Sequence, residues 1–149
     1  MKDQRPATRK HIDEVRNLIQ TMIYELNSRL IHHDESKLES PEREIFDEYT
    51  PKLKSTTYGS DEYKGYLKEM KVALDHHYAN NRHHPEHFEN GIKDMNLIDI
   101  IEMFCDWKAA TMRHDDGDIF KSIDHNQEKR FHYTDELKSI FVNTAKDIF

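Results

Sequence analysis

The chain has 149 residues, of which 36% are hydrophobic and 34% charged, with only 4 glycines and 4 prolines and a formal net charge of −7. A chain of this length can bury a core as one domain, and its low glycine and proline content argues against disorder. The acidic balance disfavours duplex nucleic acid as a partner, because phosphate binding needs a surplus of basic side chains. A small anionic substrate stays open, since the local field decides its binding.

The single cysteine, Cys105, excludes an intrachain disulfide and a thiolate-rich zinc site. No apolar run approaches the roughly 20 residues of a membrane span, and the N-terminal residues lead into no signal-like apolar region. We therefore expect a soluble cytoplasmic protein without a membrane partner. The sequence leaves a homo-oligomer open.

Apolar residues recur at helical spacing along most of the chain, and no long segment alternates with period two. The first stripe runs from Val15 to Leu26. A second helix is expected to begin with Ser40 as its N-cap and to end before Pro51. Residues 52–60 are predicted to form a loop, and a third helix is expected to run from Ser60 to His77.

Asn96 is predicted to cap a fourth helix, and a last helix is expected from about Thr134. The predicted fold class is all-α, a single compact helical bundle of about five to seven helices. We expect one domain, residues 1–149, with a motif-bearing core over about 8–112 and a C-terminal helical extension over 113–149.

Most of the 11 histidines fall in three short runs beside carboxylates. The runs are His32-His33-Asp34, His76-His77 and His83-His84-Pro85-Glu86-His87. Neutral imidazole and carboxylate are the ligands expected at hydrolytic divalent-metal sites. The clustering therefore makes metal binding the leading hypothesis.

Each run also has a structural interpretation. His33-Asp34 follows the first helical stripe, where a histidine also suits the helix dipole. His77 shares a helical face with apolar residues, as a hydrogen-bonded core histidine would. Because His83 and His84 follow closely, three buried histidines would be costly without a ligand. This cost favours metal, with His77 and His84 as the inward members of their pairs.

Asp106 lies on an apolar helical face, where a carboxylate must be paired, protonated or coordinated. The alternative partner is Lys108 or Arg113. Glu102, one turn earlier, is a candidate for orienting a histidine ligand.

Four segments stand in an order that resembles the HD-domain metal-dependent phosphohydrolase superfamily. They are His11 in "HIDEVRNLI", His33-Asp34 with Lys37 in "HHDESK", His83-His84 in "HHPEH" and Asp106 in "DWKAA". The resemblance spans roughly residues 8–112 and implies a helical domain around one or two divalent ions of Mn, Fe, Co, Ni or Zn. It implies one ion on His33, Asp34 and Asp106, with His11, and a second on His77, His83 and His84, bridged by Asp34.

The resemblance also implies a phosphohydrolase or phosphodiesterase acting on a nucleotide or cyclic nucleotide through activated water. Asp34 and Lys37 are the catalytic candidates, and Lys37, Arg113 and Arg130 are the candidates for substrate phosphate contact. Each of these three cations has a plain alternative as a solvated surface side chain. The rival functions are a catalytically silent protein that binds metal or nucleotide, and a structural helical protein whose histidines are incidental or serve as a pH switch.

The ligand role of His11 depends on a chain reversal. His11 and His33 are 22 residues apart, so one unbroken helix between them would separate the two by about 33 Å. The segment contains no glycine or proline, and Asn27-Ser28 is the best candidate for a turn.

Overall fold

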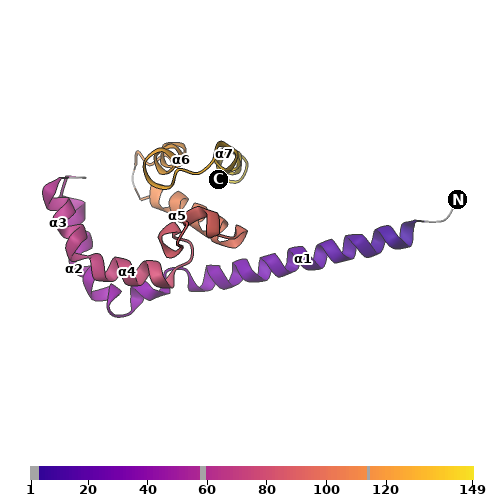
Figure 1. Cartoon of the computed structure of the whole chain (residues 1–149), viewed down its shortest axis with the longest axis horizontal. Coiled ribbons are helices and arrows are strands. Elements are labelled where there is room, and N and C mark those ends of the chain that lie inside the picture. Colours follow the sequence, from indigo (N-terminus) through magenta and orange to yellow (C-terminus); the bar gives the residue numbers. More distant parts are fainter. Residues whose placement is uncertain (1–3, 58–59, 114) are drawn as a thin grey trace. The chain divides into compact units, whose positions relative to one another are not determined.

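The computed structural model describes residues 4–57, 60–113 and 115–149, which divide into two units, Met1–His33 and Asp34–Phe149 (Figure 1). All regular structure in these ranges is helical, with seven α-helices and several short 3-10 or π turns. The predicted all-α class is confirmed. No described helix is long and apolar enough to cross a bilayer. The single-domain organisation stays a prediction.

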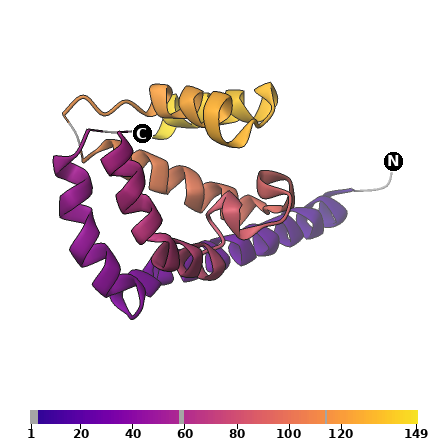
Figure 2. The same ribbon diagram turned by 60° about the vertical axis from the view of Figure 1, so that its left-hand side comes forward.

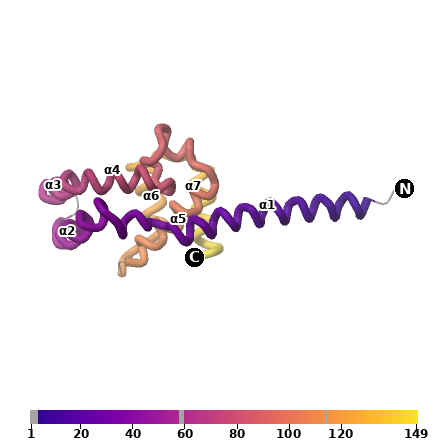
Figure 3. Tube along the Cα trace, turned by 90° about the horizontal axis from the view of Figure 1, so that it is seen from below, coloured from indigo at the N-terminus to yellow at the C-terminus, as the bar shows by residue number. Residues whose placement is uncertain are grey.

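The first unit is one helix, α1 (Arg5–His32), which Figure 3 shows as a continuous tube. The stripe around Val15 to Leu26 is helical as predicted, but the turn expected at Asn27-Ser28 is wrong. Neither residue leaves the helix, because the segment has no glycine or proline to interrupt its hydrogen bonds. None of the α1 residues is buried.

The second unit begins with a short 3-10 helix, η1 (Glu35–Leu38), followed by α2 (Glu42–Ser55). The predicted Ser40 cap is wrong: Pro41 takes the N-cap position, and the Glu42 side chain turns into the interior at the first position of α2. The predicted end before Pro51 is also wrong, because α2 runs on through it for four more residues. A proline here removes only one backbone donor near the end of the helix.

The predicted third helix is two helices, α3 (Asp61–Glu69) and α4 (Lys71–Asn80). Helix α3 begins after Ser60 as expected, and the Ser60 side chain caps it by accepting a hydrogen bond from the Tyr63 amide. Met70, with φ −75° and ψ −4°, separates the two helices, and Figure 1 shows that α3 and α4 run in different directions. Helix α2 packs against α3 and α4, as Figure 2 shows from a second side.

Two short 3-10 helices, η2 (Pro85–His87) and η3 (Gly91–Asp94), lead to α5 (Leu97–Thr111). The chain then forms α6 (Ile119–His125), a π turn η4 (Asn126–Phe131) and α7 (Asp135–Ile148). The predicted cap at Asn96 is confirmed, since Asn96 makes a reciprocal capping box with Asp99. The last helix begins where expected, and Thr134 caps it by accepting a hydrogen bond from the Leu137 amide.

The main apolar cluster joins α5 to the C-terminal helices. Its buried members are Met103, Phe104, Trp107, Ile119, Ile123, Tyr133, Phe141 and Ala145. Phe104 stacks on Phe141 with ring centroids 4.7 Å apart, and the Tyr133 hydroxyl donates to the Ile123 carbonyl at 2.6 Å. The segment predicted as an extension therefore supplies most of this core, which fixes α5 in place.

Candidate metal centre

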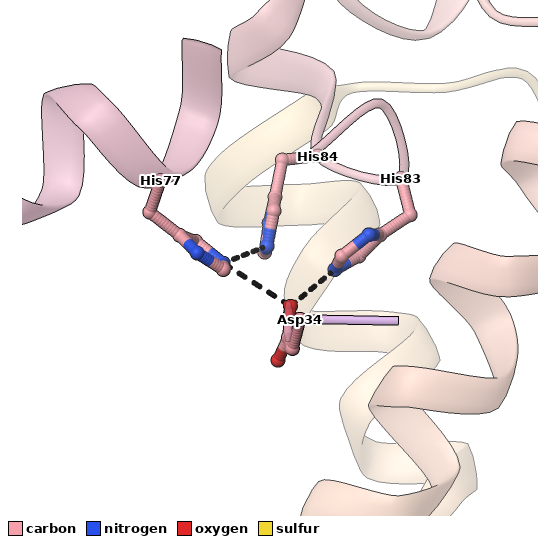
Figure 4. Close-up of side chains that lie close together, drawn as sticks. All are labelled: Asp34, His77, His83 and His84. Carbon is pink, nitrogen blue, oxygen red and sulfur yellow. Dashed lines mark hydrogen bonds and ion pairs between the residues drawn. The ribbon is translucent and has the colours of Figure 1, made fainter. Parts of the chain in front are cut away.

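Four potential ligands meet in the second unit from segments far apart in the sequence (Figure 4). Asp34 is the N-cap of η1, His77 lies on α4, and His83 and His84 lie in the turn between α4 and η2. One ligand atom from each lies within 4.8 Å of every other. The structure brings His77, His83 and His84 together as the sequence predicts, and their role as ligands stays a prediction. The choice of His84 over His83 as the inward member of that pair is wrong, because His83 is buried and His84 only partly so.

The distances match those between ligands that share one ion. The Nε2 atoms of His77 and His83 each lie 3.4 Å from Asp34 Oδ1, and the Nε2 atoms of His77 and His84 are 2.8 Å apart. Nitrogen ligands with bonds of about 2.0–2.1 Å to one ion lie about 3 Å from each other. Three imidazoles and a carboxylate thus fit a divalent transition metal with little rearrangement.

A buried carboxylate holds the far side of His77. Its Nδ1 lies 2.9 Å from Glu42 Oε2, and Glu42 is fully buried. Glu42 also accepts from His76 Nδ1 at 2.7 Å and from the Ser36 hydroxyl at 3.1 Å. Because a carboxylate accepts the Nδ1 proton, it assigns His77 the tautomer whose Nε2 carries a lone pair toward the cluster.

His83 has a similar arrangement. Its Nδ1 lies 3.2 Å from Glu102 Oε1, on α5. With the proton on Nδ1, its Nε2 also presents a lone pair to Asp34 Oδ1. Two nitrogen lone pairs and a carboxylate oxygen that face one another form an arrangement that a cation completes.

Two of the histidines, His77 and His84, are also held in their neutral form. Burial lowers the pKa of His77, and burial together with the neighbouring His83 and His77 rings lowers the pKa of His84 to about 3. Neutral imidazole is the form that coordinates metals.

Asp34 has a special backbone conformation and a fixed side chain. Its φ of 57° and ψ of 16° lie in the left-handed region, which aspartate and asparagine enter more easily than most residues. Lys37 Nζ donates to Asp34 Oδ2 at 2.6 Å, which leaves Oδ1 for the histidines. Lys37, predicted to be a catalytic or substrate-binding cation, thus contacts a candidate ligand directly.

Asp106 lies outside this four-residue group, and its role as a metal ligand stays a prediction. It lines a neighbouring pocket of about 780 Å³ together with His84. Aromatic rings form part of the pocket wall, among them Tyr78, Trp107 and Phe131. The pocket also contains Arg130, whose guanidinium lies 4.5 Å from the Phe131 ring centroid and 3.2 Å from a Glu86 oxygen. The substrate candidate Arg113 lies just after α5, and the residues lining this pocket do not include it.

The two predicted ligands in the first unit, His33 and His11, have different outcomes. His33 is the C-cap of α1 and is bonded directly to Asp34, and its ligand role stays a prediction. His11 lies on the same unbroken helix, about 33 Å from His33 along the axis. The expected chain reversal is absent from the described part of α1, so His11 cannot share an ion with His33 of the same chain. That prediction is wrong.

Sequence reasoning placed Glu102 correctly as a partner for a histidine but missed Glu42. The Ser40-Pro41-Glu42 pattern by itself predicts only the start of a helix. The available signal was the spacing of Glu42 from Ile45, Phe46 and Tyr49, which puts a carboxylate in phase with an apolar face. Such a carboxylate needs a buried partner, and the neighbouring histidine runs supply it.

Comparison with known proteins places the chain in one family. A family model described as a family of unknown function (DUF5662) matches residues 1–148, so the chain belongs to that family. No curated protein and no solved structure matches it.

Proposed function

We propose that this DUF5662 protein is a metal-dependent phosphohydrolase with its centre at Asp34, His77, His83 and His84. The observation that carries the proposal is the pair of buried histidines whose Nδ1 atoms face Glu42 and Glu102 while their Nε2 atoms face Asp34. The donor set of three nitrogens and one oxygen favours Mn, Fe, Co, Ni or Zn over Mg or Ca. Such an ion polarises a phosphoryl oxygen and lowers the pKa of a bound water.

The residues of the chain have separate tasks in this proposal. Glu42 and Glu102 orient the imidazoles, and Lys37 orients the Asp34 carboxylate. Asp106, which lines the pocket beside His84, is placed to accept a proton or a hydrogen bond from a group bound there. His33, next to Asp34 in the chain, remains a candidate further ligand on the strength of the resemblance.

The pocket supports a substrate with an organic part of nucleotide size. Its volume of about 780 Å³ lies within the range of small-molecule sites. Tyr78, Trp107 and Phe131 offer rings for packing against a planar base, and Arg130 offers a cation for a phosphate oxygen. The choice of a phosphoester, and of a nucleotide in particular, rests on the resemblance to HD-domain enzymes.

The test begins with metal analysis of protein purified without a histidine tag. Phosphate release is then measured on a panel of mononucleotides, nucleoside triphosphates and cyclic nucleotides, with Mn²⁺, Fe²⁺, Co²⁺, Ni²⁺ or Zn²⁺ added. Turnover that stops with a chelator and returns with metal supports the proposal. Bound metal without turnover on any member would favour a silent binding protein, and no metal binding at all would overturn the site.

Arg130 provides a test of the pocket. Arg130→Ala is expected to raise KM for the best substrate by about tenfold, because it removes one charge-assisted contact. Arg113→Ala is the matched control, since Arg113 does not line the pocket. Equal KM values for the two variants would mean that the substrate does not bind in this pocket.

A further inference from the structure

The turn that carries His83 and His84 is fastened by the two side chains that precede them. We call residues 81–84 the ligand turn. Asn81 Nδ2 donates to the Ser36 hydroxyl at 2.7 Å and to the His77 carbonyl at 2.8 Å. These bonds tie the start of the ligand turn to η1 and to α4, the segments that supply the other two ligands.

Arg82 ties the ligand turn to α5. Its Nε and Nη2 atoms donate to the two oxygens of Asp99 at 3.2 and 3.0 Å, a bidentate pair. Asp99 is fully buried and also accepts from the Asn96 amide in the capping box of α5. The guanidinium lies 4.9 Å from the Phe88 ring centroid, which restricts it further. A planar fork held on two oxygens fixes direction as well as distance.

The Arg82–Asp99 pair is next to the His83–Glu102 pair of the proposed metal centre. Asp99 and Glu102 are three residues apart, so they lie on one face of α5. Arg82 and His83, their partners, are consecutive. Two adjacent side chains of the ligand turn are therefore held by two adjacent carboxylates of α5, and the first contact limits how the backbone before His83 can rotate.

We infer that the Arg82–Asp99 pair is a positioning device that sets the orientation of His83 and His84 in the metal centre. The inference rests on the proposed metal-binding function. Neither Arg82 nor Asp99 belongs to the ligand group, so they act through the ligand turn. Without the bidentate pair the turn would reach the same fold, but its histidines would sample several orientations.

Arg82→Lys is the informative substitution, because it keeps the positive charge beside buried Asp99 and removes only the two-pronged geometry. The matched control is Arg43→Lys, since Arg43 pairs with Glu44 at 2.8 Å on the exposed side of α2. Binding of Co²⁺ is measured by titration, with the visible absorption of the bound ion as a record of its ligand geometry. Thermal unfolding of the metal-free proteins records the purely structural effect.

We expect Arg82→Lys to weaken Co²⁺ binding by roughly 10- to 100-fold, the range typical of residues that orient ligands, and to alter the Co²⁺ absorption band. Arg43→Lys is expected to keep both wild-type values. If Arg82→Lys is unstable without metal, Asp99→Asn carries the same test, because it keeps the volume of the side chain. Wild-type affinity and an unchanged band in a folded variant would overturn the positioning role alone. Absence of Co²⁺ binding by the wild-type protein would overturn the proposed function and this inference together.

Discussion

The fully buried Glu42 lies 2.9 Å from Nδ1 of His77, on the side of the ring opposite the Nε2 atom that faces Asp34. A carboxylate behind a histidine fixes its tautomer and raises its basicity as a ligand. Glu42 is therefore part of the proposed metal centre, although no ligand atom of it reaches the cluster.

Glu42→Gln is expected to weaken Co²⁺ or Zn²⁺ binding by roughly 10- to 100-fold. The amide can donate to Nδ1, which would favour the tautomer with its proton on Nε2, and that proton blocks coordination. Isothermal titration checks the affinity. The control is Glu44→Gln, an exposed carboxylate in the first turn of α2; similar losses in the two variants would remove Glu42 from the site.

His84 and His87 lie three residues apart but have different surroundings. His84 Nε2 lies 2.8 Å from His77 Nε2, whereas His87 Nδ1 donates to the Tyr78 carbonyl at 2.8 Å. We expect His84→Ala to lose at least tenfold in metal affinity and His87→Ala to keep the wild-type value. The metal content of the two variants is compared after dialysis at equal protein concentration. A greater loss of metal in His87→Ala than in His84→Ala would contradict the assignment of ligands in this turn.

His11→Ala is expected to leave metal stoichiometry and affinity unchanged, because α1 separates His11 from His33 by about 33 Å. His33→Ala tests what the resemblance implies for the residue before Asp34 and should weaken binding. Isothermal titration with Co²⁺ or Zn²⁺ measures the affinity of both variants. A loss of metal in His11→Ala would mean that His11 reaches a centre in another way, for example in a second copy of the chain.

Tyr133→Phe tests the core independently of the site. The variant removes the hydroxyl that donates to the Ile123 carbonyl at 2.6 Å and leaves that buried carbonyl without this donor. A loss of about 1–2 kcal/mol in the free energy of unfolding is expected. Urea denaturation measures it, and metal affinity should remain at the wild-type value. A large loss of metal affinity would show that the α5–α7 core and the site are coupled more tightly than their contacts indicate.

The sequence predicts local features of this fold well. Asn96 caps α5 as expected, and α3 and α7 begin at Ser60 and Thr134 as expected, because a helix start depends on a few adjacent residues. The sequence predicts the interruptions and ends of helices less well. Met70 interrupts a segment whose apolar spacing is continuous, and Pro51 lies inside a helix that it was expected to end. Tertiary packing overrides local sequence preference, and the spacing of apolar residues carries no information about that packing.

The candidate site likewise contains residues that the sequence predicts and residues that it does not. Histidine clustering identifies His77, His83 and His84, because buried imidazoles in series are costly without a ligand. It does not identify Glu42, which lies 35 residues before His77 and meets it only because α2 packs on α4. The error at His11 has a different cause: the motif order suggested proximity, which required a turn at Asn27-Ser28, and α1 continues through both residues.

The central claim is that Asp34 holds a divalent metal together with the three histidines. Asp34→Asn tests it most directly, because asparagine tolerates the left-handed backbone at this position and keeps the side-chain volume. Metal content of tag-free protein is measured for the wild type, for Asp34→Asn and for Asp47→Asn, an exposed position on α2. We predict a bound divalent transition metal in the wild type and in Asp47→Asn, and at least a tenfold lower affinity in Asp34→Asn with its helicity retained. Equal metal affinity in all three proteins, or none in any, would contradict the claim.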